Sequence, residues 1–125
     1  MPILALMDKI QSIEWHKVLL CTMATLFDIR KEGELFDAVK RHQPWIDQIT
    51  INKNLKCAKH VDNNKGKSLI AMFGDYTGGA MCIETVDGIE RLTERGVWYE
   101  FDGRNPHWTE DFEGERYSIV AYCKR

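Results

Sequence analysis

From Gln48 onward, short segments of β-forming residues alternate with Gly, Asn and Asp turns every eight to twelve residues. This spacing is typical of all-β sandwiches and barrels. Fewer than 80 residues hold eight such segments, namely QITINKN, KCAKHVD, KSLIAMF, AMCIET, GIERLT, GVWYEFD, HWTED and RYSIVAYC. We therefore expect a small jelly roll whose core covers residues 48–123.

The first 47 residues have a different pattern. Apolar residues recur with helical spacing from Ile3 to about Trp15, and the run EGELFDAVKRH places acids early and bases late, as a helix dipole prefers. The stretch from Val18 to Phe27 is rich in β-branched and apolar residues, and either a strand or a buried helix fits it. We expect a mainly helical N-terminal part over residues 1–47.

The length of 125 residues and a hydrophobic content of 44% are sufficient for one compact domain, so we expect a single domain over residues 1–125. The apolar stretch before Asp8 is only six residues long and lacks a basic start, which predicts neither a secretory signal nor a membrane span. Four cysteines without a C-x-x-C pair favour reduced thiols. These features predict a protein that is not secreted and not bound to a membrane, located in the cytoplasm or, in a eukaryote, in the nucleus.

The most informative chemical pattern is a histidine and an aspartate one residue apart. His60 and Asp62 lie in the predicted strand KCAKHVD, where the two-residue period places both side chains on one face. His107 follows 45 residues beyond Asp62, after a turn that ends in Pro106. An isolated H-x-D is more often a hydrogen-bonding pair, but two histidines and one carboxylate form the facial triad of non-haem iron(II) oxygenases. We predict that His60, Asp62 and His107 bind one metal ion.

A candidate carboxylate-binding residue opens the last predicted strand. Arg116 comes nine residues after His107, and Ser118 shares its face because side chains alternate along a strand. An arginine fork matches a planar carboxylate, and a neighbouring hydroxyl adds a further donor. The alternative is a structural arginine that pairs with Glu113 or Glu115.

Taken together, the runs HVD, GDYTGGAM, FDGRNPH and GERYS resemble the iron(II) and 2-oxoglutarate dependent oxygenase superfamily over about residues 48–123. The resemblance implies a cupin-like double-stranded β-helix and a dioxygenase, or hydroxylase, that uses Fe(II), 2-oxoglutarate and O2 to oxidise a C–H bond. It implies that His60, Asp62 and His107 are the iron ligands and that Arg116, aided by Ser118, binds the far carboxylate of 2-oxoglutarate. These four residues, the triad and Arg116, would be the catalytic set.

Two further elements carry the resemblance. Asn52 and Asn54, in the run N-x-N, are similar to the N-x-Y that binds the co-substrate in related repair demethylases. Gly78 and Gly79 resemble paired glycines of the superfamily, whose missing Cβ allows a tight turn and close backbone approach. Trp108, directly after a predicted ligand, either lines the pocket or packs at its rim.

The substrate is indicated only by finer features. The run N-x-G-x-S after HVD is similar to the TET/JBP clade, whose members oxidise the methyl group of a nucleic-acid base, and the lysines at 53, 56, 59, 65 and 67 could neutralise phosphates. A nucleic-acid base is therefore the leading expectation, with DNA or RNA as the partner. The G-G-x-M and R-x-S elements also resemble prolyl hydroxylases, so a protein side chain or a small metabolite is the alternative. A non-catalytic, metal-binding jelly-roll module is the third interpretation.

Overall fold

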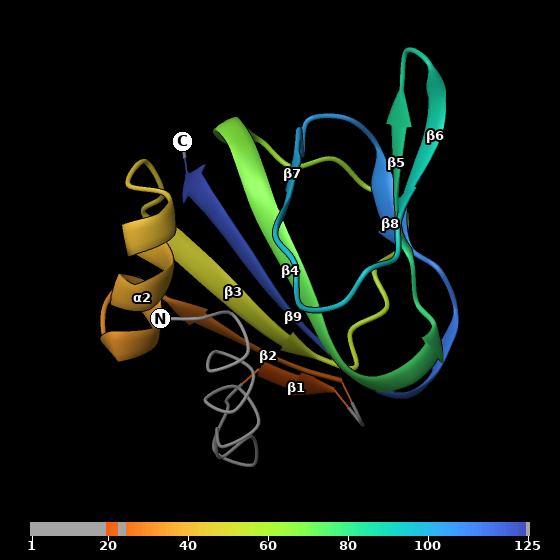
Figure 1. Cartoon of the computed structure of the whole chain (residues 1–125), viewed down its shortest axis with the longest axis horizontal. Helices are drawn as coiled ribbons and strands as arrows, with labels where there is room; N and C mark the ends of the chain where they lie inside the picture. The colour runs from red at the N-terminus through yellow and green to blue at the C-terminus, as the bar shows by residue number, and fades with distance from the viewer. Residues whose placement is uncertain (1–19, 23–24, 125) are drawn as a thin grey trace.

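The computed structural model describes residues 20–22 and 25–124, which form two antiparallel β-sheets and one helix (Figure 1). The larger sheet has the strand order β1-β2-β3-β9-β4-β7, and the smaller sheet has the order β6-β5-β8. The elements are β1 (Leu20–Thr22), β2 (Thr25–Arg30), α2 (Glu34–His42), β3 (Gln48–Lys53), β4 (Asn64–Gly78), β5 (Met81–Thr85), β6 (Gly88–Leu92), β7 (Tyr99–Phe101), β8 (His107–Thr109) and β9 (Phe112–Lys124). The predicted mainly-β class is confirmed for the part of the chain that is described.

The N-terminal part is less helical than predicted. The helix expected within EGELFDAVKRH is confirmed as α2, with Glu34 and Asp37 in its first turn, where acids are favourable. Residues 20–22 and 25–30, however, are strands, so the prediction of a mainly helical part over 1–47 is wrong there. β2 pairs with β3 from Leu26 to Arg30, and this pairing decides in favour of a strand where the sequence allowed either a strand or a buried helix. The helix expected from Ile3 to Trp15 lies outside the described residues.

Two hydrophobic cores lie on opposite faces of the larger sheet, because side chains alternate along its strands. On β4, the residues Leu69, Ala71 and Phe73 belong to the core beneath α2, whereas Ile70 and Met72 face the smaller sheet. Figure 1 shows α2 against one face of the larger sheet and the strands β5, β6 and β8 beyond the other face.

β9 follows the same alternation and brings polar groups between the sheets. Tyr117, Ile119 and Ala121 pack in the core beneath α2. The intervening residues Arg116 and Ser118 therefore point into the space between the two sheets, where they line a pocket. The long pairing of β9 with β4, which has a bulge between Lys65 and Leu69, anchors this wall of the pocket.

One predicted strand is not formed. The segment KCAKHVD is a loop with a single isolated bridge between His60 and His107, whereas the other seven segments overlap observed strands. None of the helices described is long and apolar enough to cross a membrane. The described cysteines Cys57, Cys82 and Cys123 are free thiols.

Candidate metal centre

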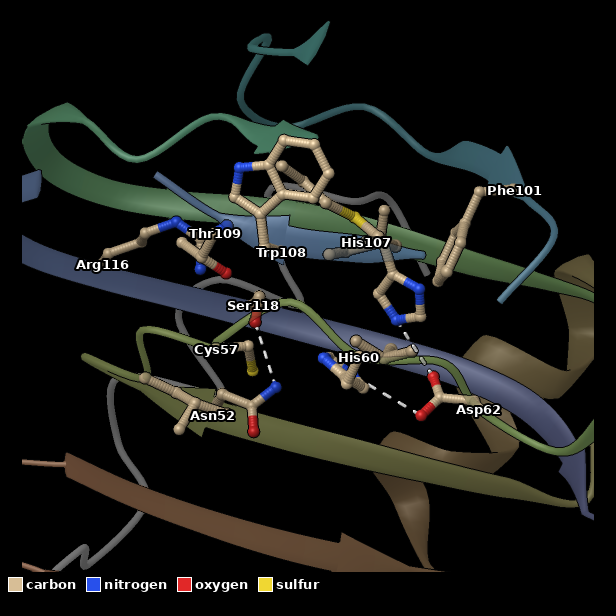
Figure 2. A pocket seen from close by; sticks show the side chains of 14 residues that line it. Asn52, Cys57, His60, Asp62, Phe101, His107, Trp108, Thr109, Arg116 and Ser118 are labelled. Carbon is tan, nitrogen blue, oxygen red and sulfur yellow. Dashed lines mark hydrogen bonds and ion pairs between the residues drawn. The ribbon is translucent and has the colours of Figure 1, made fainter. Parts of the chain in front are cut away.

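His60, Asp62 and His107 converge between the two sheets. One potential ligand atom from each lies within 4.8 Å of the others. The Asp62 carboxylate has Oδ1 at 3.5 Å from His60 Nε2 and Oδ2 at 3.2 Å from His107 Nε2, as the dashed lines of Figure 2 show. His107 is buried and His60 is exposed, so the triad has a protected side and an open side. Two histidines and one carboxylate in this arrangement match the donor set of a facial triad for a divalent ion such as Fe(II).

Backbone hydrogen bonds, rather than a continuous strand, hold the ligands in place. The His60 N–H donates to the His107 carbonyl at 3.0 Å, and the His107 N–H donates to the His60 carbonyl at 2.9 Å. The Asp62 N–H donates to the Gly103 carbonyl at 2.8 Å, and a Cβ on Gly103 would lie 3.3 Å from Asp62 Oδ2. Thus both ends of the H-x-D segment are tied to the segment that carries His107.

Each imidazole is oriented through its Nδ1 atom. Nδ1 of His60 lies 2.7 Å from the Ala58 carbonyl oxygen, and Nδ1 of His107 lies 2.8 Å from the Asn105 carbonyl oxygen. Since a carbonyl oxygen only accepts, both Nδ1 atoms donate and both Nε2 atoms are left to bind a metal. Such bonds fix the tautomer and the ring orientation of metal-binding histidines.

Asp62 and His107 perturb each other's protonation. Burial lowers the pKa of His107, but the hydrogen bond that its ring donates to Asp62, the hydrogen bond with the Asn105 backbone and the Asp62 charge outweigh burial, so that the pKa is raised. The hydrogen bond with His107 lowers the pKa of Asp62 despite partial burial. A proton and a metal ion would therefore compete for the position between these two side chains.

Arg116 is a buried cation with no acidic partner. It is 2% exposed, and no carboxylate within residues 25–124 forms a salt bridge with it. Its Nε donates to the Gly79 carbonyl at 3.0 Å, but Nη2 is buried without a hydrogen-bond partner. Burial lowers its pKa. The alternative of a structural pairing with Glu113 or Glu115 is not observed, so the guanidinium is buried without a countercharge, which is costly.

Asn52 and Ser118 lie between Arg116 and the triad. They face each other across β3 and β9, and Asn52 Nδ2 donates to Ser118 Oγ at 3.1 Å. Both side chains are buried, and Asn52 Oδ1 has no hydrogen-bond partner. Figure 2 shows Arg116 at one end of the pocket, the triad at the other, and this pair between them.

Asn54 is placed differently from the prediction that it contacts the co-substrate. Its side-chain oxygen accepts a hydrogen bond from the Arg116 backbone N–H at 2.8 Å, and its own N–H donates to the Arg116 carbonyl at 2.7 Å. It has φ of 56°, immediately after β3 ends. Asn54 therefore fastens the chain to β9 next to Arg116, and it does not line the pocket.

The pocket has an empty volume of about 470 Å³, which includes the space at its open mouth. It is lined by Asn52, Leu55, Cys57, His60, Asp62, Ile70, Met81, Phe101, His107, Trp108, Thr109, Arg116, Ser118 and Val120. Trp108 is thus a lining residue, as one of its two interpretations predicted. Thr109 could have been found from its alternation with His107, whereas no sequence signal distinguished Cys57.

Three of the five lysines near the metal-binding segment pair with carboxylates. Lys56, Lys59 and Lys67 pair with the carboxylates of Asp111, Glu84 and Glu100, respectively. Lys53 Nζ lies 5.8 Å from the centroid of the Tyr117 ring, a residue of the core beneath α2. Most of this charge is therefore compensated or directed away from the pocket.

No protein-family model matches the sequence, and no curated protein sequence matches it. Solved structures do resemble it. A Pseudomonas putida prolyl-4-hydroxylase is 14% identical with a TM-score of 0.67, covering 98% of this chain and 86% of its own. An oxidoreductase of the 2OG-Fe(II) oxygenase family from Burkholderia pseudomallei is 17% identical with a TM-score of 0.55, covering 62% of this chain. The aligned region spans only 43% of that second protein. At these identities the likeness establishes a shared fold, in agreement with the predicted double-stranded β-helix.

Proposed function

We propose that this protein is an Fe(II) and 2-oxoglutarate dependent dioxygenase that hydroxylates a C–H bond. The observation that carries the proposal is a pocket with a His-Asp-His triad at one end and a buried arginine without a countercharge at the other. A 2-oxo dicarboxylic acid suits both ends, since its keto acid chelates a metal and its far carboxylate needs a cation. A non-catalytic jelly roll that binds a metal only for structural support does not require a buried arginine in the same pocket.

The residues have separable tasks in this mechanism. His60, Asp62 and His107 would hold the metal at one end of the pocket. Arg116 would bind the far carboxylate of 2-oxoglutarate, while Asn52 and Ser118 offer hydrogen bonds along the same wall. Phe101 and Met81 provide an apolar lining that restricts water. When bound, iron and 2-oxoglutarate together supply the oxygen activation and the oxidation of the C–H bond.

For the substrate, we favour a protein side chain or a small metabolite. The likeness to a prolyl-4-hydroxylase and the compensated lysine charges support this choice. The nucleic-acid base of a TET/JBP-like enzyme remains the second candidate, because Lys65 lies in an exposed position near the start of β4. Neither the TET/JBP placement nor a nucleic-acid partner has support from the comparisons.

A turnover assay tests the proposal. Iron-loaded protein is mixed with 2-oxoglutarate and, in parallel, with DNA, RNA or peptide pools, and succinate release is measured. We expect release that one pool stimulates and that His107→Ala abolishes. Stimulation by peptides supports the hydroxylase proposal, whereas stimulation by DNA or RNA, with binding that weakens steeply with salt, supports the base-oxidising alternative. Metal binding without any 2-oxoglutarate binding would indicate the non-catalytic module.

A further inference from the structure

A second groove opens beside the metal pocket, along the floor that β3 and β9 form. It has an empty volume of about 700 Å³, including the space at its mouth, and is lined by Thr50, Asn52, Leu55, Cys57, Asp62, Asn64, Val120, Tyr122 and Lys124. Asn52, Cys57 and Asp62 are among the residues that line both the groove and the metal pocket. The groove therefore lies between residues 55–64 and the two strands, and it leads to the metal centre.

The groove is long for a small molecule. Asn52 pairs with Ser118, and Lys124 lies six residues further along β9. At about 3.3 Å per residue, the floor extends about 20 Å from Asn52 to Lys124. Asn64 pairs with Lys124, so the segment that covers the groove spans the same length. About six residues of extended peptide fit this length, whereas a metabolite the size of an amino acid would occupy only part of it.

The inner end of the groove has a hydrogen-bond acceptor that the co-substrate cannot use. Asn52 is 6% exposed and its Nδ2 donates to Ser118 Oγ, but Oδ1 is buried and has no hydrogen-bond partner among the described residues. Figure 2 shows this oxygen on the side of the amide away from Ser118. An ionised 2-oxo dicarboxylic acid has only acceptor groups, so it cannot donate to Oδ1. Because buried polar groups are nearly always hydrogen-bonded, Oδ1 suits a donor on the substrate, such as a peptide N–H.

A pair of hydroxyl groups further along the floor has a donor to offer. Gln48 Nε2 donates to Tyr122 Oη, which lies 2.9 Å from Thr50 Oγ1. The two hydroxyls share one hydrogen bond, so whichever of them donates it, the other keeps a proton for a ligand carbonyl. Thr50 is two residues from Asn52 on the same face of β3, about 6.6 Å along the strand. An extended peptide repeats the N–H and C=O groups of one edge at the same interval.

The outer end of the groove carries an exposed cation. Lys124 forms no salt bridge with a carboxylate of residues 25–124, and the Asp47 carboxylate accepts a hydrogen bond from the Lys124 backbone N–H instead. One such lysine is too little charge to follow the phosphates of a nucleic-acid strand. It suits a single acidic side chain.

We propose that this groove binds an extended peptide of a substrate protein, with Asn52 accepting a backbone N–H and Lys124 pairing with an acidic side chain. This inference rests on the proposed function, whose substrate class it narrows to a protein. Since Asn52 also lines the metal pocket, the hydroxylated residue lies at that end of the groove. The length of the floor then places the acidic residue about four to six residues away from the hydroxylated one.

The test uses two fluorescently labelled pools of random peptides, each about twelve residues long. The second pool has Asn and Gln in place of Asp and Glu. Binding to anaerobic protein loaded with Fe(II) and saturating 2-oxoglutarate is measured by fluorescence anisotropy. We expect the acidic pool to bind more tightly, and Lys124→Glu to weaken its binding by about threefold to tenfold, with a smaller loss at high salt. Asn52→Leu should weaken both pools by about threefold to tenfold, because every peptide loses one hydrogen bond.

Lys31→Glu is the matched control, because it reverses an exposed charge next to α2 and should change neither affinity. Circular dichroism reports whether each variant is folded, and the exposed Lys124 keeps the test available if Asn52→Leu is not. Equal binding of the two pools, or acidic-pool binding that Lys124→Glu leaves unchanged, overturns the inference. Unchanged affinities in folded Asn52→Leu overturn the contact assigned to Asn52.

The failure of this inference is distinguishable from the failure of the proposed function. If free amino acids stimulate succinate release and neither peptide pool binds, the inference is overturned and the proposed function stands. If the wild-type protein does not bind 2-oxoglutarate, the proposed function is overturned. The peptide titration, repeated without 2-oxoglutarate, then tests the groove alone.

Discussion

His60 and His107 exchange two backbone hydrogen bonds, of 3.0 and 2.9 Å, and this isolated bridge places their rings 4.3 Å apart between centroids. Backbone hydrogen bonds therefore hold the two candidate ligands together. It follows that loss of the ion should remove activity and still leave the fold largely intact.

Replacement of the carboxylate tests this separation of metal binding from folding. In Asp62→Ala the metal loses its only acidic ligand, and we expect metal affinity to fall at least tenfold to a hundredfold. Asp62 is half-buried and held through its backbone, so the circular dichroism spectrum should be unchanged. Asp75→Ala, which removes an exposed carboxylate from β4, serves as the control and should bind metal normally. Global unfolding of Asp62→Ala would contradict this account.

Metal binding should depend on pH through His107. The ion and a proton compete for Nε2 of His107, whose pKa is raised above its ordinary value of 6.5 in the metal-free protein. Affinity for Mn(II), used as a stable probe, should therefore decline by about tenfold per pH unit below that raised pKa, starting at a higher pH than for an ordinary histidine.

The stability of the metal-free protein should show the opposite trend. The protonated His107 and its Asp62 partner stabilise the fold fully below the unfolded-state pKa of about 6.5, and this contribution is lost as pH rises through the raised pKa. Thermal unfolding of metal-free protein across this range measures the loss. The Asp62→Ala variant, which lacks the pair, is the reference. If the melting temperature of the wild-type protein rises relative to that of Asp62→Ala over this pH interval, the His107–Asp62 pair does not stabilise the fold as proposed.

Gly79 should control the position of Arg116. In Gly79→Ala the new Cβ would crowd Tyr76 and Arg116 at 3.0 and 3.1 Å, and the φ of +73° disfavours any side chain. We expect a stability loss of about 1–2 kcal/mol together with weaker 2-oxoglutarate binding. Gly66→Ala is the control, since Gly66 has a similar φ of +70° but no atom within 4 Å of the added Cβ. It should lose similar stability and retain 2-oxoglutarate affinity. Equal affinities in the two variants would show that Gly79 does not position the arginine.

Removal of the Arg116 side chain should weaken the binding of 2-oxoglutarate and leave metal binding unchanged. Arg116→Ala leaves the far carboxylate without its countercharge, a loss of roughly 2–5 kcal/mol for a buried pair. Affinity for 2-oxoglutarate should then drop by about thirtyfold or more, at about 1.4 kcal/mol per tenfold. Arg116→Lys should recover only part of the loss, because an ammonium group lacks the planar fork. Calorimetric titrations of metal and 2-oxoglutarate, performed separately, distinguish this outcome from a general loss of structure.

The elements that the sequence predicted best are those with local signals. The H-x-D pattern, the later histidine and the R-x-S run each carried their chemistry in a few adjacent residues, and the structure brings His60, Asp62, His107, Arg116 and Ser118 to one pocket. The strand alternation also predicted correctly that Arg116 and Ser118 share a face.

What the sequence did not reveal depends on pairing between distant segments. The sequence alone did not distinguish Tyr76, and only the β4–β9 register shows that its side chain lies beside Arg116. Local preference left the stretch from Val18 to Phe27 undecided, and in its described part the pairing of β1 with β2 and of β2 with β3 produces strands. Asn54 belongs to an N-x-N run that resembles a co-substrate motif, but it has a positive φ and its side chain accepts a hydrogen bond from the Arg116 backbone. Its role is therefore to hold the two backbone segments together.

The most direct test of the central claim is an anaerobic titration of 2-oxoglutarate into wild-type protein with and without Fe(II). The account predicts saturable binding that requires the metal, is lost in Asp62→Ala together with the metal, and is weakened in Arg116→Ala while the metal is retained. Iron-loaded wild-type protein that fails to bind 2-oxoglutarate, or binds it equally well without Arg116, would contradict the assignment of this pocket.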